Sequence, residues 1–136
     1  MKFKTLYGAT RVVSNPKKYL INWDEKSKSK IQKATKDFLK KYWENYVVFE
    51  EFPVAGSRMS LDFYNATKKI AIEVQGAQHT KYTPFFHGDN KYNYLSQLRR
   101  DQDKLKFCEL NSIHLLEIYK KKELTVGFFK KSGVSL

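Results

Sequence analysis

Residues 60–75 decide the fold, and they read SLDFYNATKKIAIEVQ. Two short runs rich in apolar residues, 60–64 and 69–75, flank a turn over residues 65–68, and this arrangement predicts a β-hairpin. In the second run, β-branched apolar residues alternate with other residues, as expected for a strand whose two faces differ.

Two acidic residues interrupt these strands at matched positions. Asp62 lies in the first strand and Glu73 in the second, where carboxylates are disfavoured. If the hairpin turns about Thr67 and Lys68, the two residues face each other, with Cβ atoms about 5 Å apart. Carboxylates that close repel each other unless a cation separates them. Because Mg²⁺ prefers oxygen ligands, the pair predicts a Mg²⁺ site, with Mn²⁺ as a substitute.

A structural role for the two acids is the alternative. One carboxylate could pair with Arg58 or Lys69, or both could face water at an edge of the sheet. Gln75 follows on the same face as Glu73. Its amide cannot act as a base at neutral pH, but it can orient a water molecule or a phosphate oxygen.

The rest of the chain predicts further helices and strands around this hairpin. Helices are expected over 25–43, 91–110 and 122–131, and strands over 46–52 and 113–119. Asp24 is the expected N-cap of the first helix, and His114 is expected to have a structural role. The residues expected to form the apolar face of the first helix are Ile31, Ala34, Phe38 and Tyr42. This order predicts a small α/β fold, with a mixed four-stranded sheet flanked by helices.

The second helix is expected to turn an apolar face to the sheet, and this face carries an acid. Asp101 falls between Leu98 and Leu105 on that face. Burying an unpaired charge is costly, so Asp101 needs a partner. His79, in a long loop after the hairpin, could be held by Asp101 and act as a general acid or base. The alternative partners are Arg99, Arg100 and Lys104.

Charge is distributed unevenly along the chain. Lys and Arg number 26 against 14 Asp and Glu, which gives a net charge of +12, and residues 1–41 hold 12 basic and 3 acidic side chains. Such an excess is typical of proteins that bind nucleic acid, and a lysine-rich solvated surface is the alternative. We expect residues 1–24 to form a basic arm or extension that lies on nucleic acid or packs on the domain.

Length and composition limit the remaining possibilities. The 136 residues fit one domain, expected over 25–136, and the single cysteine excludes an internal disulfide. The chain shows neither the run of about 18 apolar residues that a membrane span needs nor the apolar run of a signal peptide. We therefore expect a cytoplasmic protein without a membrane partner.

The acids and their context resemble a known family of enzymes. The pattern Asp62…Glu73-Val74-Gln75 resembles the PD-(D/E)xK nuclease superfamily, with Gln75 in place of the usual lysine. With His79, the later Arg100-Asp101 and the strand at 113–118, the match extends over roughly residues 28–119. This wider pattern looks like the very-short-patch-repair (Vsr-like) branch, which includes free-standing phage homing endonucleases described by an EDxHD motif.

The resemblance implies a restriction-endonuclease-like core and a Mg²⁺-dependent endonuclease that hydrolyses phosphodiester bonds in double-stranded DNA. It implies that Asp62 binds the metal, while Glu73 and Gln75 match a variable stretch of the family. From the hairpin itself we expect Glu73 to share the metal and Gln75 to position the attacking water. His79, oriented by Asp101, then transfers the proton. The family's first glutamate has no clear counterpart, and the candidates are Gln32, Asp37, Glu44 and Glu51.

Contacts with DNA are expected from basic side chains near the acids and from aromatic side chains after the hairpin. These residues are Arg58, Lys81, Arg99, Arg100, Lys104, Phe85 and Phe86. The expected activity is that of a site-specific, homing-type endonuclease, acting alone or as a homodimer. The alternatives are a structure-selective nuclease for Holliday junctions, nicks or mismatches, and a non-catalytic DNA-binding domain on a nuclease fold.

Overall fold

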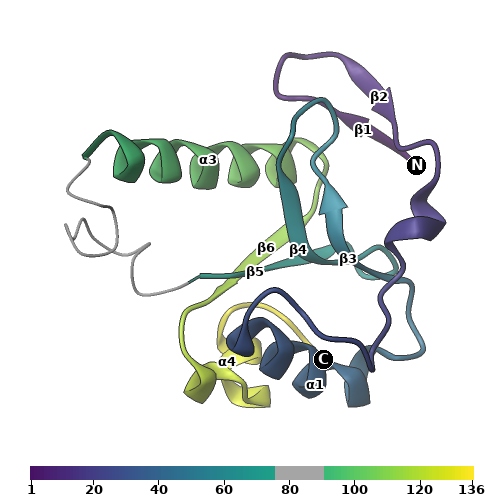
Figure 1. The fold of residues 1–136 in the computed structure, drawn as a ribbon. Coiled ribbons are helices and arrows are strands. Elements are labelled where there is room, and N and C mark those ends of the chain that lie inside the picture. Colours follow the sequence, from purple (N-terminus) through teal and green to yellow (C-terminus); the bar gives the residue numbers. More distant parts are fainter. Residues whose placement is uncertain (76–90) are drawn as a thin grey trace.

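The computed structural model describes residues 1–75 and 91–136. Four strands form one sheet in the order β3-β4-β5-β6 (Figure 1). β4 is antiparallel to β3 and β5, whereas β6 is parallel to β5. The strands are β3 (Val48–Pro53), β4 (Ser60–Asn65), β5 (Ile70–Val74) and β6 (His114–Ile118). The predicted small α/β fold with a mixed four-stranded sheet is confirmed.

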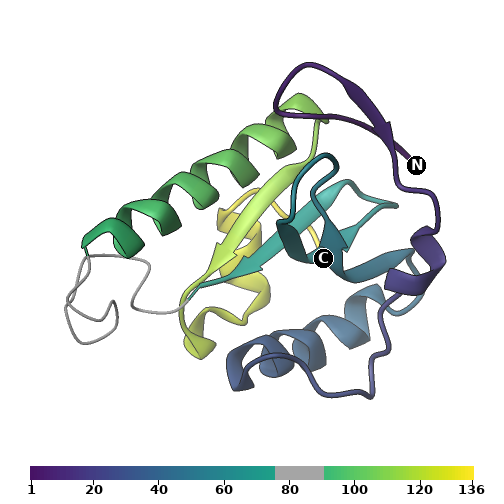
Figure 2. The same cartoon turned by 45° about the horizontal axis from the view of Figure 1, so that its top comes forward.

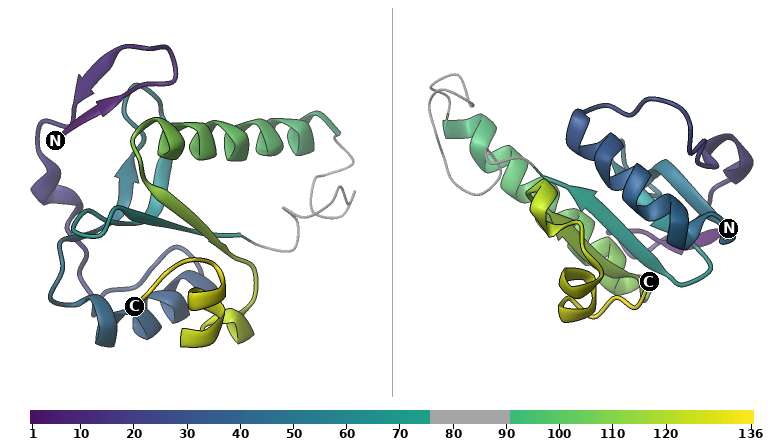
Figure 3. Two further views of the ribbon diagram at one scale, coloured as in Figure 1. Left: turned by 180° about the vertical axis from the view of Figure 1, so that it is seen from behind. Right: turned by 90° about the horizontal axis from the view of Figure 1, so that it is seen from below.

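Helices cover both faces of the sheet. α3 (Lys91–Leu110) lies on one face, and α1 (Lys30–Trp43) and α4 (Val126–Lys131) lie on the other (Figures 1 and 3). Phe107 and Cys108 attach α3 to one apolar core, while Phe63 and Ile72 belong to the second core on the α1 side. The central strands β4 and β5 are therefore buried between helices, and any polar side chain on them needs a partner.

The N-terminal residues pack against the domain. β1 (Lys2–Lys4) and β2 (Thr10–Val12) form a two-stranded antiparallel sheet, followed by the short 3-10 helix η1 (Pro16–Tyr19) (Figure 2). Phe3 is 6% exposed, and its ring centroid lies 5.6 Å from that of Phe52 and 5.7 Å from that of Phe107. Of the two expectations for this segment, the structure shows packing on the domain.

The first helix differs from its prediction at its start and on its buried face. Ser29, not Asp24, is the N-cap: its Oγ accepts the Gln32 N–H at 3.1 Å, while Asp24 pairs with Lys40. The predicted apolar face is only half-buried. The buried residues are Gln32, Thr35, Lys36, Leu39 and Trp43. Polar residues occupy this face because Gln32 and Lys36 bond to Glu50 on β3.

The later helices also show differences. α3 has the predicted bounds, but Leu105 is 45% exposed, so its assignment to the buried face was wrong. The predicted helix over 122–131 is divided into η3 (Lys121–Glu123) and α4, because Thr125 starts a new helix by accepting the Phe128 N–H at 3.1 Å. His114 bonds to the Ser132 carbonyl through Nε2, at 2.8 Å. Of the helices in the described residues, none has the length and apolar character needed to cross a membrane.

Candidate active site

The β4–β5 hairpin places two carboxylates face to face. The last paired positions are Phe63 and Ile72, and Asp62 and Glu73 take the next facing position, as a turn at 67–68 predicts. The Asp62 N–H donates to Glu73 Oε2 at 2.7 Å, and the Val74 N–H donates to Asp62 Oδ2 at 2.7 Å. Each carboxylate thus accepts an N–H from the opposite strand at the point where the regular ladder ends.

A lysine from α3 neutralises part of this acid pair. Lys104 Nζ lies 2.5 Å from Glu73 Oε1, and the Glu73 side chain is only 4% exposed. β4 and β5 are interior strands, so the acids do not lie at an edge of the sheet. The cation that contacts Glu73 comes from neither Arg58 nor Lys69, the partners that the local sequence suggested.

Burial changes the protonation of both acids. It raises the pKa of Glu73 to about 7, assisted by the charge of Asp62 and opposed by Lys104. Burial also raises the pKa of Asp62, although the hydrogen bond from the Val74 N–H and the charge of Lys104 both lower it. Both carboxylates therefore favour added positive charge, and groups with perturbed pKa values of this kind are frequent at functional sites.

Glu51 on β3 is a third acid beside this pair. It faces the position of Asp62, between the paired positions Glu50–Phe63 and Phe52–Leu61. Its φ angle of 54° lies in the left-handed region, which is unfavourable for a side chain other than glycine. Strain of this kind persists only where the surroundings hold it, and it is frequent at functional sites.

Lys28 connects Glu51 to the acid pair. Lys28 Nζ lies 3.1 Å from Glu51 Oε2, which also accepts the Ser60 hydroxyl at 3.1 Å. Burial lowers the pKa of Lys28, but the hydrogen bond to Glu51 and the charges of Glu51, Asp62 and Glu73 outweigh it and raise that pKa. Two ammonium groups therefore act on the acid pair, Lys104 by direct contact with Glu73 and Lys28 through its charge.

A cavity of about 410 Å³ opens above the two acids. It is enclosed by β4, β5, the segment before α1, the turn before β4 and α3. Its charged lining side chains are Lys28, Arg58, Arg100, Lys104, Asp62, Glu73 and Asp101. Four of these side chains are basic and three are acidic, so an anion that enters the cavity meets positive charge beside the acids.

The donor set suits a divalent cation with oxygen ligands. Asp62 and Glu73 supply carboxylates, and each gives one oxygen to a backbone N–H, Oδ2 in Asp62 and Oε2 in Glu73. No cluster of three or more acidic, histidine or cysteine side chains suited to a metal occurs within residues 1–75 and 91–136. Mg²⁺ is usually held by one or two carboxylates together with waters and substrate phosphates, so two carboxylates fit this ion.

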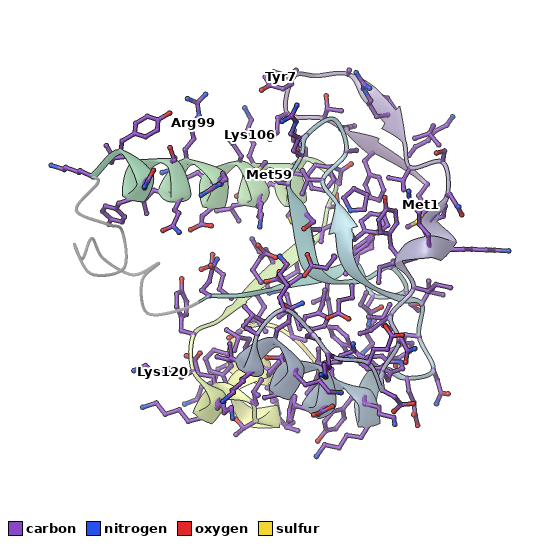
Figure 4. All side chains as sticks on the ribbon, viewed as in Figure 1. Met1, Tyr7, Met59, Arg99, Lys106 and Lys120 are labelled. Carbon is purple, nitrogen blue, oxygen red and sulfur yellow. The ribbon has the colours of Figure 1, made fainter. Side chains whose placement is uncertain are left out.

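The other residues predicted from the sequence fall in three groups. Gln75, Asp101, Arg58 and Arg100 line the cavity with the acid pair. Arg99 points away from the sheet on the outer side of α3, as does Lys106 (Figure 4). His79, Lys81, Phe85 and Phe86 lie outside the described residues.

Two contributors to the site lie far from the hairpin in sequence. Lys28 precedes α1, and no local pattern distinguishes it from the other lysines of the basic N-terminal region. Glu51 was one of four candidates for the family's first glutamate. Of these, Gln32 and Glu51 bond to each other, at 3.0 Å between Gln32 Nε2 and Glu51 Oε1. In the register of β3 and β4, Glu51 lies opposite Asp62. This register is the signal that could have distinguished Glu51 from the other three candidates.

Comparisons with known proteins found similar viral proteins. The chain is 34% identical over 74 residues to uncharacterized protein 307L of Invertebrate iridescent virus 6, covering 54% of this chain and 37% of that protein. It is 35% identical over 80 residues to uncharacterized protein 094L of Frog virus 3 (isolate Goorha), covering 58% and 51%. It is 33% identical over 66 residues to uncharacterized protein 033L of Invertebrate iridescent virus 3, covering 48% and 34%.

The chain thus spans between about a third and half of the length of the curated relatives it matches. No family model matches it, and no solved structure is significantly similar to it.

Proposed function

We propose that this protein is a Mg²⁺-dependent DNA endonuclease. The observation that carries the proposal is the acid pair: Asp62 and Glu73 face each other on adjacent interior strands, joined through backbone N–H groups. They line a cavity that is also lined by four basic side chains. Buried carboxylates on a regular strand are unfavourable for stability. Two facing carboxylates in contact with one ammonium group, that of Lys104, still favour a further cation, and this supports the proposal.

Asp62 and Glu73 are the residues that would hold the metal. A divalent cation held there would polarise the scissile phosphate and would supply a water molecule of lowered pKa. Gln75, in the same cavity, orients water or a phosphate oxygen through its amide. Arg58 and Arg100, which line the cavity, would hold the neighbouring phosphates by charge-assisted hydrogen bonds.

Proton transfer is assigned to a histidine in this proposal. His79 would give or take the proton, oriented by Asp101, which lines the cavity at α3. The net charge of +12 supports nucleic acid as the substrate, because such an excess favours association with a polyanion. We expect the target to be a specific sequence in duplex DNA, as for a homing-type endonuclease.

Cleavage of defined DNA tests the proposal. The purified protein is incubated with long duplex DNA and with a four-way junction, each with Mg²⁺ or with EDTA, alongside the variant Asp62→Asn. Discrete Mg²⁺-dependent fragments from the duplex, absent with Asp62→Asn, are the expected result. Cleavage confined to the junction would instead identify a structure-selective nuclease. Binding without cleavage of either DNA, or of a library of duplex targets, would indicate a non-catalytic DNA-binding domain.

A further inference from the structure

Lys104 occupies one oxygen of Glu73, a proposed cation ligand. Glu73 Oε2 accepts the Asp62 N–H at 2.7 Å, so Oε1 is the oxygen without a backbone partner among the described contacts. Lys104 Nζ lies 2.5 Å from Oε1 and is 18% exposed as a side chain. The acid pair therefore already carries one positive charge, supplied by the protein itself.

An ammonium group and a divalent cation on the same carboxylate repel each other. Their charges have the same sign, and repulsion between charges is strong where burial excludes water. A cation that binds to Asp62 and Glu73 therefore competes with Lys104. Movement of the Lys104 ammonium away from Oε1 would relieve this repulsion.

The Lys104 side chain lies in the same cavity as other groups that can bind a phosphate. It lines the same cavity as Arg58 and Arg100, and a lysine stem of four methylene groups turns easily. Once released from Glu73, its ammonium group lies among the side chains that face an incoming phosphate. An ammonium that has lost a carboxylate partner in a partly buried position gains by binding another anion.

We propose that Lys104 couples cation binding to phosphate binding at this site. The inference rests on the proposed function, since it takes the acid pair as the cation site and DNA as the anion. Lys104 weakens cation binding while no DNA is present, because it competes for Glu73. It strengthens DNA binding once the cation is bound, because it then contacts a phosphate. By linkage, DNA must strengthen cation binding by the same factor.

Binding measurements on substituted proteins test this coupling. Mg²⁺ affinity is measured by calorimetry without DNA at several pH values above 7, because loss of Lys104 raises the pKa of Glu73 further. DNA affinity is measured by fluorescence anisotropy with and without Ca²⁺, which also takes oxygen ligands. The variants are Lys104→Gln and Lys104→Arg. Lys106→Gln is the matched control, because Lys106 lies on the outer side of the same helix.

The expected results have opposite signs for the two ligands. Lys104→Gln should bind Mg²⁺ roughly tenfold or more tightly than the wild type, the size of one charge's effect on an adjacent carboxylate. The increase in DNA affinity that Ca²⁺ causes should be smaller in this variant. Lys104→Arg keeps the charge and should bind Mg²⁺ no more tightly than the wild type, and Lys106→Gln should leave Mg²⁺ affinity unchanged.

A purely supporting role for Lys104 gives a different outcome. If Lys104 only positions Glu73, Lys104→Gln should bind Mg²⁺ equally or more weakly, and this result would overturn the inference. If Lys104→Gln does not fold, NMR of the lysine side-chain amines in the wild type replaces it. The Lys104 amine signal should change on addition of Mg²⁺, and an unchanged signal at saturation would also overturn the inference.

The two proposals fail in distinguishable ways. If the wild type cleaves DNA but Lys104→Gln gains no Mg²⁺ affinity, the proposed function stands and only the coupling is wrong. If the wild type neither binds Mg²⁺ nor cleaves DNA, the proposed function is wrong, and the coupling that rests on it is wrong as well.

Discussion

Asp62 and Glu73 are joined by reciprocal contacts across the β4–β5 hairpin: the Asp62 N–H donates to Glu73, and the Asp62 carboxylate accepts the N–H of Val74, which follows Glu73. The two side chains thus hold each other's strands together while their charges repel. The backbone hydrogen bonds stabilise the two acids in this position, whereas the repulsion between their charges favours a cation between them. Substitution and titration can separate these two contributions.

Asp62→Asn should abolish cleavage and leave the fold and DNA binding intact. Asparagine keeps an oxygen that can accept the Val74 N–H, so the hairpin contact remains. It removes a negative charge that the metal needs. Cleavage assays with Mg²⁺, DNA binding by anisotropy and thermal unfolding give the three readouts. Asp37→Asn is the control, because Asp37 is exposed and pairs only with Lys33 in its own helix among the described contacts. Normal cleavage by Asp62→Asn would exclude Asp62 as a metal ligand.

The free energy of unfolding should decrease as pH rises towards neutrality when no metal is present. Glu73 has an ordinary pKa of 4.5 and a pKa of about 7 in the folded protein. Between these values the folded state holds a proton that the unfolded state has released. The contribution of Glu73 to the free energy of unfolding is therefore fully present below the pKa of the unfolded state. It is lost as pH rises through the pKa of the folded state, at up to roughly 1.4 kcal/mol per pH unit.

Urea unfolding in EDTA across this pH range measures the effect. Glu73→Gln has no titrating group at this position, so its stability should depend less steeply on pH than that of the wild type. Parallel curves for the two proteins would show that Glu73 is not the group responsible.

Glu51→Gly should be more stable than Glu51→Ala by about 1 kcal/mol. Both variants lose the same side-chain contacts with Lys28, Gln32 and Ser60, so these cancel in the comparison. They differ in the cost of a φ angle of 54°, which alanine pays and glycine avoids. In an ordinary strand position the order is reversed, because glycine is less stable there than alanine. Chemical denaturation measures the difference, and greater stability of the alanine variant would contradict a strained backbone at Glu51.

Arg100→Ala should weaken DNA binding and reduce its dependence on salt. Arg100 lines the cavity of the acid pair, and removing one phosphate-binding cation lowers the slope of log K against log salt by about one. Lys130→Ala is the matched control, because Lys130 belongs to α4 on the opposite face of the sheet (Figure 1). Anisotropy titrations at several salt concentrations measure both. Equal salt slopes for the two variants would place the DNA on a different surface.

Much of the fold and part of the site could be predicted because they depend on local patterns. The alternation in 69–75 and the turn at 65–68 determine the hairpin, and the turn length alone opposes Asp62 to Glu73. The polar and apolar pattern over 91–110 likewise predicts the bounds of α3. These features involve residues within one element or one tight turn, where spacing determines geometry.

Other features were decided only by the tertiary structure. Gln32 and Lys36 are buried on α1 because Glu50, a residue of another element, needs their bonds. Glu51 adopts its unusual φ within a ladder whose partner strand is formed by later residues. Lys104 reaches Glu73 across 31 positions of sequence. Each of these contacts joins residues distant in the chain, and which of several lysines meets a given carboxylate depends on how the helices pack. The sequence by itself therefore determined the two strands and the facing acids, whereas packing decided which cations and which third carboxylate surround them.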